Sequence, residues 1–502
     1  MKAPIIYLAT FSLLVVLKPS MAEEPPAARE AFFPIKVYGP SFRPSGAVLS
    51  GTAGNIAGSR EPAEGVARDN PWLDWWNGTY MLGGDGQFGP DYRGRLKDRG
   101  ISFDSNYQGA FFGVVDSQKG SRGFWNQQLN LAAQINLGDL LDAGHLRGIS
   151  FYGAVRYRDS WPESNPNEFV EAQSMFNPTN WQSGTQFRVL GFGIQLDTDK
   201  LLPVEHMLTL KLGWIQPQKE FIDQPLSKLF LNNAVNSAKG VGGNIPFSSS
   251  FSTWGGVLTV RPHENFYFRN GLFMSFPSAT ASQNHGLAFS GFGPDPALNG
   301  LFYMGEAGYT PLVGPSRLPG KYAFGGYFYG LPGGQAVSWN GTPTDGQYGF
   351  YFQADQMLYR EPSPPVEQAG SSGKNPVASK GAVVPEPSIS NQGLKAFNLL
   401  MFAPGYARSN VFPFYFQTGL VYAGLLPARD LDLSMISLGY GAYQGGVSSP
   451  ERSYTAVLEA AYRYQINGWS YAQPFVQYFI RPDGTGDVQN ATVLGFSVGV
   501  VF

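Results

Sequence analysis

Charged side chains in this chain recur inside short stretches that otherwise alternate between apolar and polar residues. Arg156 and Arg158 lie two positions apart in AVRYR, and Glu459 and Arg463 lie four apart in EAAYR. Even spacing places side chains on one face of a β-strand. Such a face presents fixed hydrogen-bond donors and acceptors, and the rigid guanidinium fork of Arg is well suited to this. The spacing therefore predicts a polar surface that contacts small solutes or forms ion pairs.

Histidine, the usual base beside an activated nucleophile, is scarce in this sequence. The chain has 4 histidines, and all fall in links between the expected strands, with no local Ser or Asp motif beside them: His145, His206, His263 and His285. This disfavours a membrane-embedded lipase or protease, which assays on lipid and peptide substrates would test. We expect no catalytic residue, no cofactor and no metal site.

Composition narrows the class of protein. The 502 residues are 43% hydrophobic, 15% aromatic and 14% charged, with 63 glycines, no cysteine and a net charge of -2. The near-neutral charge argues against nucleic acid as a partner. Without disulfides, stability must come from the backbone hydrogen-bond network, and abundant aromatic and glycine residues suit interface girdles and curved strands.

The N-terminal part predicts three segments. Lys2, an apolar run over 5–17 and the sequence SMA predict a signal peptide over 1–22. Residues 23–70 are rich in Pro, Ala, Gly and Ser without periodicity, which predicts a flexible linker. In the segment 71–100, the sequence YRGRLKDRG predicts a short helix that ends at Gly100.

The clearest pattern is the closing stretch, 491–502. Large apolar residues from Leu494 to Phe502 alternate with small ones such as Gly495 and Ser497, so one strand face is bulky. An open edge of this kind invites aggregation, whereas a closed barrel in lipid pairs the last strand with the first. We expect the apolar set to face lipid, the small set to face the lumen, and the strand to pair with one starting near Ile101.

The same alternation continues through residues 101–502 and predicts an all-β fold, a transmembrane antiparallel β-barrel of about 16 strands with a short N-terminal helix. In the fourth strand we place Leu190, Phe192 and Ile194 on the outer face. The predicted strands are 101–115, 125–137, 148–160, 186–198, 207–216, 251–262, 264–276, 301–311, 321–331, 347–359, 394–403, 411–424, 431–443, 453–467, 469–481 and 491–502.

The links between strands support this count. Those after odd-numbered strands include long ones, such as 217–250, whereas even-numbered strands are followed by tight turns such as Asn467-Gly468. The link 361–392 breaks the rule, being long and rich in Pro, Ser and Gly after an even-numbered strand. Either it is a disordered insertion or the count slips by one near Tyr351; we favour the insertion because the later strands keep their parity. We expect Arg429 and Asp430 to brace a short turn.

Several stretches resemble the carbohydrate-selective porins of the OprB family. The opening sequence GDGQFGPDYRGRLKDRGISFD (84–104), the stretches 265–273, 350–360 and 419–432, and the last three strands with their closing aromatic are similar to motifs of that family. The resemblance covers about 84–502 and departs from the family at 23–70 and 361–392. It implies a sixteen-stranded outer-membrane barrel and the uptake of sugars.

Strand parity also predicts the residues that line the lumen and its narrow zone. The charged residues among them are Asp104, Arg156, Arg158, Arg269, Glu306, Glu459 and Arg463. The alternative for each one is a salt-bridge ladder that supports the wall without touching solute. Inward amides such as Gln128 and Asn130 are interpreted as solvated lining. Three tryptophans are interpreted as an interface belt rather than a stacking platform for sugar: Trp161, Trp181 and Trp254.

We expect a passive channel for small saccharides in the bacterial outer membrane, in contact with lipid, either as a single barrel or as a trimer. One alternative is a general or anion-selective diffusion porin, in which inward Arg residues draw anions. Another is a structural protein that tethers the envelope through residues 23–70. Block of the ionic current by sugars, and not by organic anions, would distinguish a sugar channel from the first alternative. Uptake that stays intact after deletion of 23–70 would distinguish a channel from the second.

Overall fold

The computed structural model describes residues 80–82, 92–162, 166–171, 174–179, 185–198, 207–222, 224–238, 240, 244, 251–275, 283–287, 300–329, 336–337, 343–344, 347–362, 392–403, 411–443 and 452–502. The predicted signal peptide (1–22), the predicted linker (23–70) and most of the predicted insertion (361–392) lie outside this described part of the chain.

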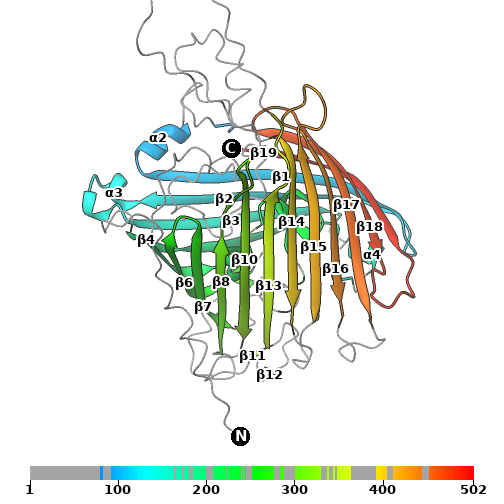
Figure 1. The fold of residues 1–502 in the computed structure, drawn as a ribbon. Coiled ribbons are helices and arrows are strands. Elements are labelled where there is room, and N and C mark those ends of the chain that lie inside the picture. The colour runs from blue at the N-terminus through cyan, green and yellow to red at the C-terminus, as the bar shows by residue number, and fades with distance from the viewer. Residues whose placement is uncertain are drawn as a thin grey trace, which may run out of the picture.

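Sixteen long strands close into an antiparallel β-barrel, which confirms the predicted fold class (Figure 1). Consecutive long strands pair with one another, and β1 pairs with both β2 and β19, which closes the ring. The long strands are β1 (Ile101–Asp116), β2 (Arg122–Asn136), β3 (Ile149–Trp161), β4 (Gln186–Asp197), β5 (Leu208–Ile215), β6 (Thr253–His263), β7 (Phe266–Ser275), β8 (Gly300–Tyr309), β10 (Leu318–Tyr329), β13 (Gln347–Met357), β14 (Gly393–Phe402), β15 (Phe414–Ala423), β16 (Leu433–Ala442), β17 (Tyr454–Gln465), β18 (Ser470–Ile480) and β19 (Ala491–Val501). Short strand β9 (Leu312–Val313) pairs with β10, and β11 (Ala336–Val337) pairs with β12 (Pro343–Thr344).

The closing strand β19 has the predicted orientation. Phe496 lies opposite Phe111 of β1, with the two ring centroids 6.0 Å apart. Leu494 and Phe496 are each 46% exposed on the outer face, whereas Ser497 is 1% exposed on the inner face. The bulky set therefore faces outward, toward lipid, and β19 pairs with the first strand as expected.

Strand β4 departs from simple alternation. Val189 and Gly191 both have partners on β3, whereas the register skips Leu190, which forms a β-bulge. Leu190 is 1% exposed and packs with inward-facing alanines of β2 and β3. The predicted outward placement of Leu190 is therefore wrong, because the extra residue reverses the faces on its N-terminal side. The same reversal turns Arg188 inward.

The strand count does not slip at Tyr351. This residue pairs with Gly325 of β10 and Met401 of β14, so β13 is a regular member of the ring. Links after odd-numbered strands of the ring meet at one end, the long-link rim, which is lower in Figure 1. Links after even-numbered strands meet at the other end, the short-link rim, with the chain's C-terminus. In bacterial barrels the short turns lie on the periplasmic side.

The predicted N-terminal helix is α2 (Tyr92–Asp98), and it lies at the short-link rim (Figure 1). Gly100 ends it as expected, with φ of 75° and an N–H that donates to the Lys97 carbonyl at 2.9 Å. No helix in the described part of the chain is both long and apolar enough to cross a membrane.

The turn between β15 and β16 is braced by Arg429, as expected, but its partner is Asp432 rather than Asp430. The Arg429 guanidinium donates to both Asp432 carboxylate oxygens, at 2.8 and 2.7 Å, and to the Gln465 carbonyl at 2.9 Å. The hydrogen bonds to Asp432 raise the pKa of Arg429 above its ordinary value.

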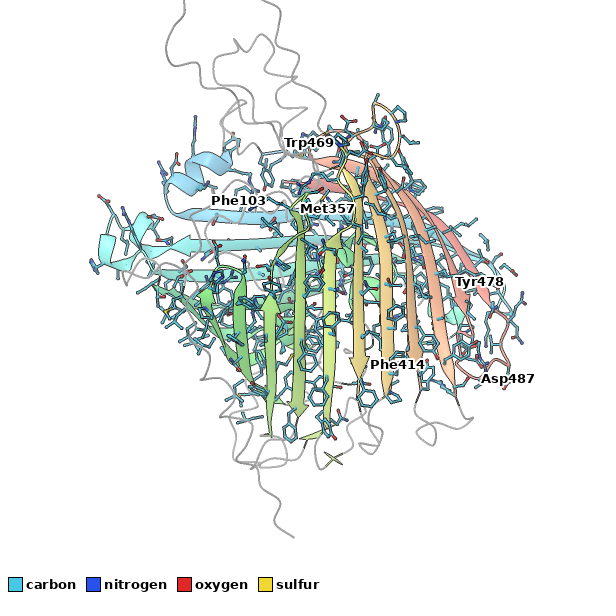
Figure 2. The ribbon with its side chains drawn as sticks, in the orientation of Figure 1. Phe103, Met357, Phe414, Trp469, Tyr478 and Asp487 are labelled. Carbon is cyan, nitrogen blue, oxygen red and sulfur yellow. The ribbon has the colours of Figure 1, made fainter. Side chains whose placement is uncertain are left out.

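Aromatic side chains lie near both rims. Trp469 lies at the short-link rim, and Phe414 and Tyr478 lie toward the long-link rim (Figure 2). Trp161 is 72% exposed at the end of β3, as an interface position requires. Trp254 instead packs against another tryptophan, with ring centroids 5.4 Å apart. Trp181 lies outside the described residues.

Candidate functional site: the lumen and its inner segment

The link between β5 and β6 folds into the barrel. Its residues 216–222 and 224–238 are called the inner segment and form α5 (Pro217–Phe221), η5 (Ser227–Leu229) and α6 (Asn233–Asn236). Most of its described residues are buried although they belong to no strand. Links normally run over a protein surface, so a buried one must have its main-chain polar groups satisfied by the barrel wall.

One end of the inner segment is held by β5, β7 and β13. Glu220 forms an ion pair with Lys211 of β5 at 3.0 Å, and both side chains are nearly buried. Arg269 of β7 donates to the main-chain carbonyl of Glu220. Gln353 of β13 donates to the Phe221 carbonyl at 2.8 Å.

Glu306 of β8 contacts the wall side chains that hold this end of the inner segment, which is called the first anchor. Its carboxylate accepts hydrogen bonds from the Tyr267 hydroxyl at 2.7 Å, the Tyr351 hydroxyl at 3.0 Å and the Gln353 amide at 2.7 Å. Glu306 also lies directly opposite Arg269 in the register of β7 and β8. It therefore orients Gln353 through a hydrogen bond and places a carboxylate beside Arg269, two of the three wall side chains that bind the inner segment here.

A stretch farther along the inner segment, 229–232, is held by β17, whereas the last residues return to Gln218, whose side-chain amide donates to the Ser237 and Ala238 carbonyls. The Glu459 carboxylate accepts the main-chain N–H groups of Leu231 at 2.8 Å and Asn232 at 2.7 Å. Arg463 donates to the Leu229 carbonyl at 3.2 Å. Strands β7 and β17 are the seventh and fourteenth of sixteen in the ring, so the two anchors lie almost half the barrel apart.

Apolar packing places the inner segment against β14, β15 and β16. Phe230 lies over Phe397, with ring centroids 5.6 Å apart. The apolar cluster around this pair comprises Leu226, Leu229, Phe230 and Val235 of the inner segment with Phe397, Val421, Ala423, Leu433 and Met435 of the wall. This side of the lumen is therefore filled.

Described residues of the link between β3 and β4 also lie inside the barrel and contact the inner segment. The Asn233 N–H donates to the Asn177 carbonyl at 3.1 Å, and the Asn177 N–H donates to the Asn233 side chain at 2.8 Å. Phe176 stacks on Phe412 beyond β14, with ring centroids 5.7 Å apart. The two links thus hold each other across the lumen.

The wall formed by β1 to β4 carries a row of polar side chains facing the lumen. Arg156 lies opposite Arg188 in the register of β3 and β4. Two chains of hydrogen bonds cross the neighbouring strands: Arg156 to Asn130 at 2.6 Å and Asn130 to Asn106 at 2.9 Å, and Arg158 to Gln128 at 3.3 Å and Gln128 to Gln108 at 2.8 Å. The amides predicted as solvated lining therefore orient the arginines.

Two of these arginines retain unused donors. Arg158 Nη2 and Arg188 Nε and Nη1 are buried and have no hydrogen-bond partner among the described residues. The Arg188 guanidinium lies over the Phe251 ring, 5.0 Å from its centroid. Buried donors of this kind are costly unless water or a ligand satisfies them. They are donors of this wall that the described residues leave unsatisfied.

The predicted site residues thus fall into three places. Arg269, Glu306, Glu459 and Arg463 hold the inner segment directly or through a neighbour, and Arg156 and Arg158 lie on the polar wall. Asp104 lies apart from both groups, near the short-link rim, with Arg93 as a charged neighbour. Their roles toward solute stay predictions. No group of three acidic or histidine side chains suited to a metal ion occurs in the described part of the chain.

Further charged residues inside the barrel were not among those predicted, and those that belong to this site are Arg188, Lys211 and Glu220. Arg188 was missed because the bulge at Leu190 reverses its face, and a charged residue between Phe187 and Val189 was the signal that pointed to it. Lys211 lies on the inward face of a short strand, and no sequence pattern indicates that Glu220 folds back to meet it.

Comparisons with known proteins agree with this architecture. The model of the carbohydrate-selective porin family, OprB, matches residues 198–502, more than half of the chain. Porin B of Pseudomonas aeruginosa is 24% identical over 320 residues, which cover 59% of this chain and 65% of that relative. The match therefore spans less than two thirds of the relative's length.

Solved structures of Pseudomonas putida OprB share the fold. The high-pH structure has a TM-score of 0.66 at 20% sequence identity and covers 85% of this chain and 99% of its own. The low-pH structure has a TM-score of 0.51 at 17% identity, with the same coverage. The family model and the closed sixteen-stranded barrel lead to one assignment: this chain belongs to the OprB family of carbohydrate-selective porins.

Proposed function

We propose that this protein is a passive outer-membrane channel through which small neutral sugars diffuse down their gradient, without covalent chemistry or a cofactor. The observation that carries the proposal is the set of unused guanidinium donors on Arg158 and Arg188, at buried positions of the lumen wall. Membership of the family supports the same function.

Sugar hydroxyl groups suit this wall. Each hydroxyl both donates and accepts hydrogen bonds, so it can accept from Arg158 or Arg188 and donate to a neighbouring amide oxygen. The Arg158 guanidinium is held by Gln128 at 3.3 Å, and the neighbouring Arg156 guanidinium by Asn130 at 2.6 Å. These two side chains therefore lose little freedom when solute binds. Selectivity in channels depends on such groups lining the pore.

The inner segment forms the constriction in this proposal. It spans between anchors on β7 and β17 and packs on β14 to β16, so solute passes between it and the polar wall of β1 to β4. The charged residues predicted as lining then have two roles: Arg156 and Arg158 contact solute, and Arg269, Glu306, Glu459 and Arg463 set the width of the passage.

The proposal includes export through a signal peptide over 1–22, insertion into outer-membrane lipid with the short-link rim toward the periplasm, and function as a monomer or a trimer. Planar-bilayer recording tests the function. Monosaccharides added to one side should block the ionic current, and Arg158→Gln and Arg188→Gln should each weaken the block. Unchanged block in both variants, with normal barrel formation, would refute the proposed site.

An anion-selective porin is the second candidate, and one observation favours it. Arg156, Arg158 and Arg188 lie together on β3 and β4, and neither Arg158 nor Arg188 forms an ion pair among the described residues. Such a cluster attracts anions. If organic anions block the current and neutral sugars do not, this second function holds and sugar selectivity is wrong.

A further inference from the structure

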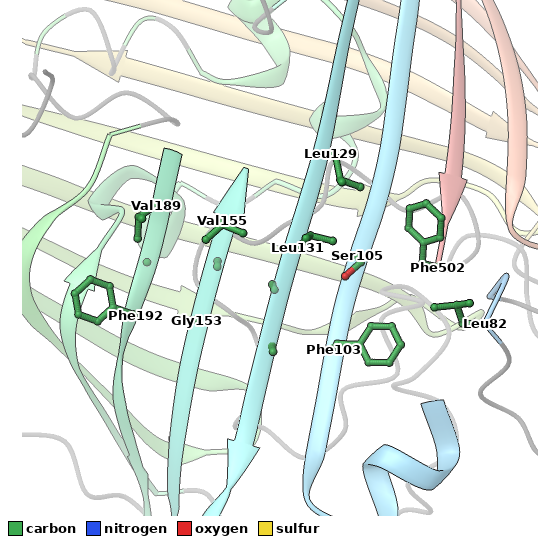
Figure 3. Close-up of a pocket in the computed structure, with 14 residues that line it drawn as sticks. Leu82, Phe103, Ser105, Leu129, Leu131, Gly153, Val155, Val189, Phe192 and Phe502 are labelled. Carbon is green, nitrogen blue, oxygen red and sulfur yellow. The ribbon is translucent and has the colours of Figure 1, made fainter. Parts of the chain in front are cut away.

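The outer wall of the barrel carries an apolar hollow across β1 to β4. Its volume is about 710 Å³, and its lining includes Leu82, Phe103, Leu131, Val155, Phe192 and Phe502 (Figure 3). This volume lies within the range of about 300–1,000 Å³ that is usual for small-molecule sites.

Small residues form the floor of the hollow. In the strand register, Phe103 lies beside Ala133, Ala133 beside Gly153, and Gly153 beside Phe192. Two large rings therefore flank two positions with almost no side chain. A Cβ atom built at Gly153 meets no other atom within 4 Å, so the space above it is open. Because these residues share the outer face with Leu131, which is 44% exposed, the hollow opens toward lipid.

The hollow lies close to the short-link rim and to helix α2. Phe103 is the third residue of β1, only about 7 Å along the strand from its first residue. Arg93 of α2 lies over the Phe103 ring, 4.5 Å from its centroid, and donates to the Phe502 carbonyl. The helix is thereby fixed at the mouth of the hollow, as Figure 3 shows.

Helix α2 adds positive charge at this mouth. Arg95, Lys97 and Arg99 are exposed in or directly after it, against one acidic residue, Asp98. Cationic side chains just outside the hydrocarbon region attract the headgroups of anionic lipids. Apolar space facing hydrocarbon and basic charge at the adjoining rim are the two features that a phospholipid requires.

We propose that this hollow binds an anionic phospholipid of the periplasmic leaflet. One acyl chain lies over Ala133 and Gly153, between Phe103 and Phe192, and the phosphate lies beside the cations of α2. The site is on the outside of the barrel, so it is independent of what passes through the lumen.

Native mass spectrometry of the full-length protein in detergent tests this proposal, with phosphatidylglycerol and phosphatidylcholine of equal chain length as probes. The wild type should retain one phosphatidylglycerol in preference to phosphatidylcholine. Gly153→Leu fills the hollow and should weaken retention about tenfold, the loss expected when about two methylene groups lose their burial. Gly123→Leu is the matched control, since it makes the same change on the outer face of β2 near the other rim, where an added Cβ makes only ordinary contacts of 3.6 Å or more.

A second variant tests the headgroup. Arg95→Gln with Arg99→Gln removes two of the three exposed cations and should sharply reduce the preference for phosphatidylglycerol while leaving retention of phosphatidylcholine unchanged. Equal retention of both lipids by the wild type would overturn the anionic assignment, and full retention by Gly153→Leu would overturn the site. If Gly153→Leu instead separates an oligomer without losing lipid, the hollow is a contact between subunits and the proposal is wrong. Heat-modifiable migration on gels checks that each variant forms a barrel.

Discussion

Glu459→Ala should release the inner segment around Leu231 and Asn232 from the wall and widen the pore. Glu459 is 1% exposed, and its carboxylate accepts two main-chain N–H groups at 2.8 and 2.7 Å. Hydrogen bonds to a charged group contribute about 1.5–3 kcal/mol each, so the pair contributes about 3–6 kcal/mol. Lumen water can replace part of this, which favours the lower end of that range. A loss of about 3 kcal/mol raises the population of the released segment by about two orders of magnitude.

Single-channel conductance and liposome swelling measure this release. We expect larger, noisier conductance and weaker discrimination between monosaccharides and disaccharides. Glu459→Gln is the control, because its amide oxygen still accepts one main-chain N–H, and it should give an intermediate effect. If Glu459→Ala forms a heat-stable barrel with wild-type conductance and discrimination, the reasoning that Glu459 holds the constriction is wrong.

Three further predictions concern the wall and its packing. Arg188→Gln should shift the reversal potential in a salt gradient toward cation selectivity, because it removes a positive charge that no ion pair among the described residues neutralises. An unchanged reversal potential would place Arg188 outside the conduction path. Gly439→Ala should raise conductance as Glu459→Ala does, because the added Cβ would lie 2.8 Å from the Ala234 Cβ of the inner segment. Overpacking of this kind costs about 1–3 kcal/mol of stability. Wild-type conductance would show that the position of α6 does not depend on this contact. Phe496→Arg should destabilise the barrel by about 2–4 kcal/mol if it lies near the bilayer midplane, measured as a lower urea midpoint in liposomes, whereas Ser497→Thr on the inner face should have little effect.

The fold was predictable because each long strand carries its own signal. Alternation predicted the faces of β2 and β19 and the number of strands, and link parity supported that number. The bulge at Leu190 was not predictable in this way, because an extra residue leaves composition unchanged and alters only the register with β3. Sequence therefore placed Leu190 on the wrong face and missed Arg188.

The candidate site was only partly predictable for a different reason. Parity identifies that Glu459 and Arg269 point inward, but their partners belong to a link without periodicity. The tie between Glu459 and Leu231 joins positions far apart in the chain and depends on how the inner segment crosses the lumen. The sequence therefore indicates that these charged side chains point into the barrel. That they hold the inner segment could be found only from the three-dimensional structure.

The two anchors of the inner segment have a mechanical consequence. A ring of hydrogen-bonded strands can flatten into an ellipse while keeping every strand pairing intact, because only the angles between neighbouring strands change. Because the inner segment crosses the barrel between β7 and β17, flattening the barrel would stretch or compress this segment. If this segment is the constriction proposed above, a change in the roundness of the barrel should change the width of the pore. We therefore expect lateral pressure from a more crowded bilayer to alter conductance.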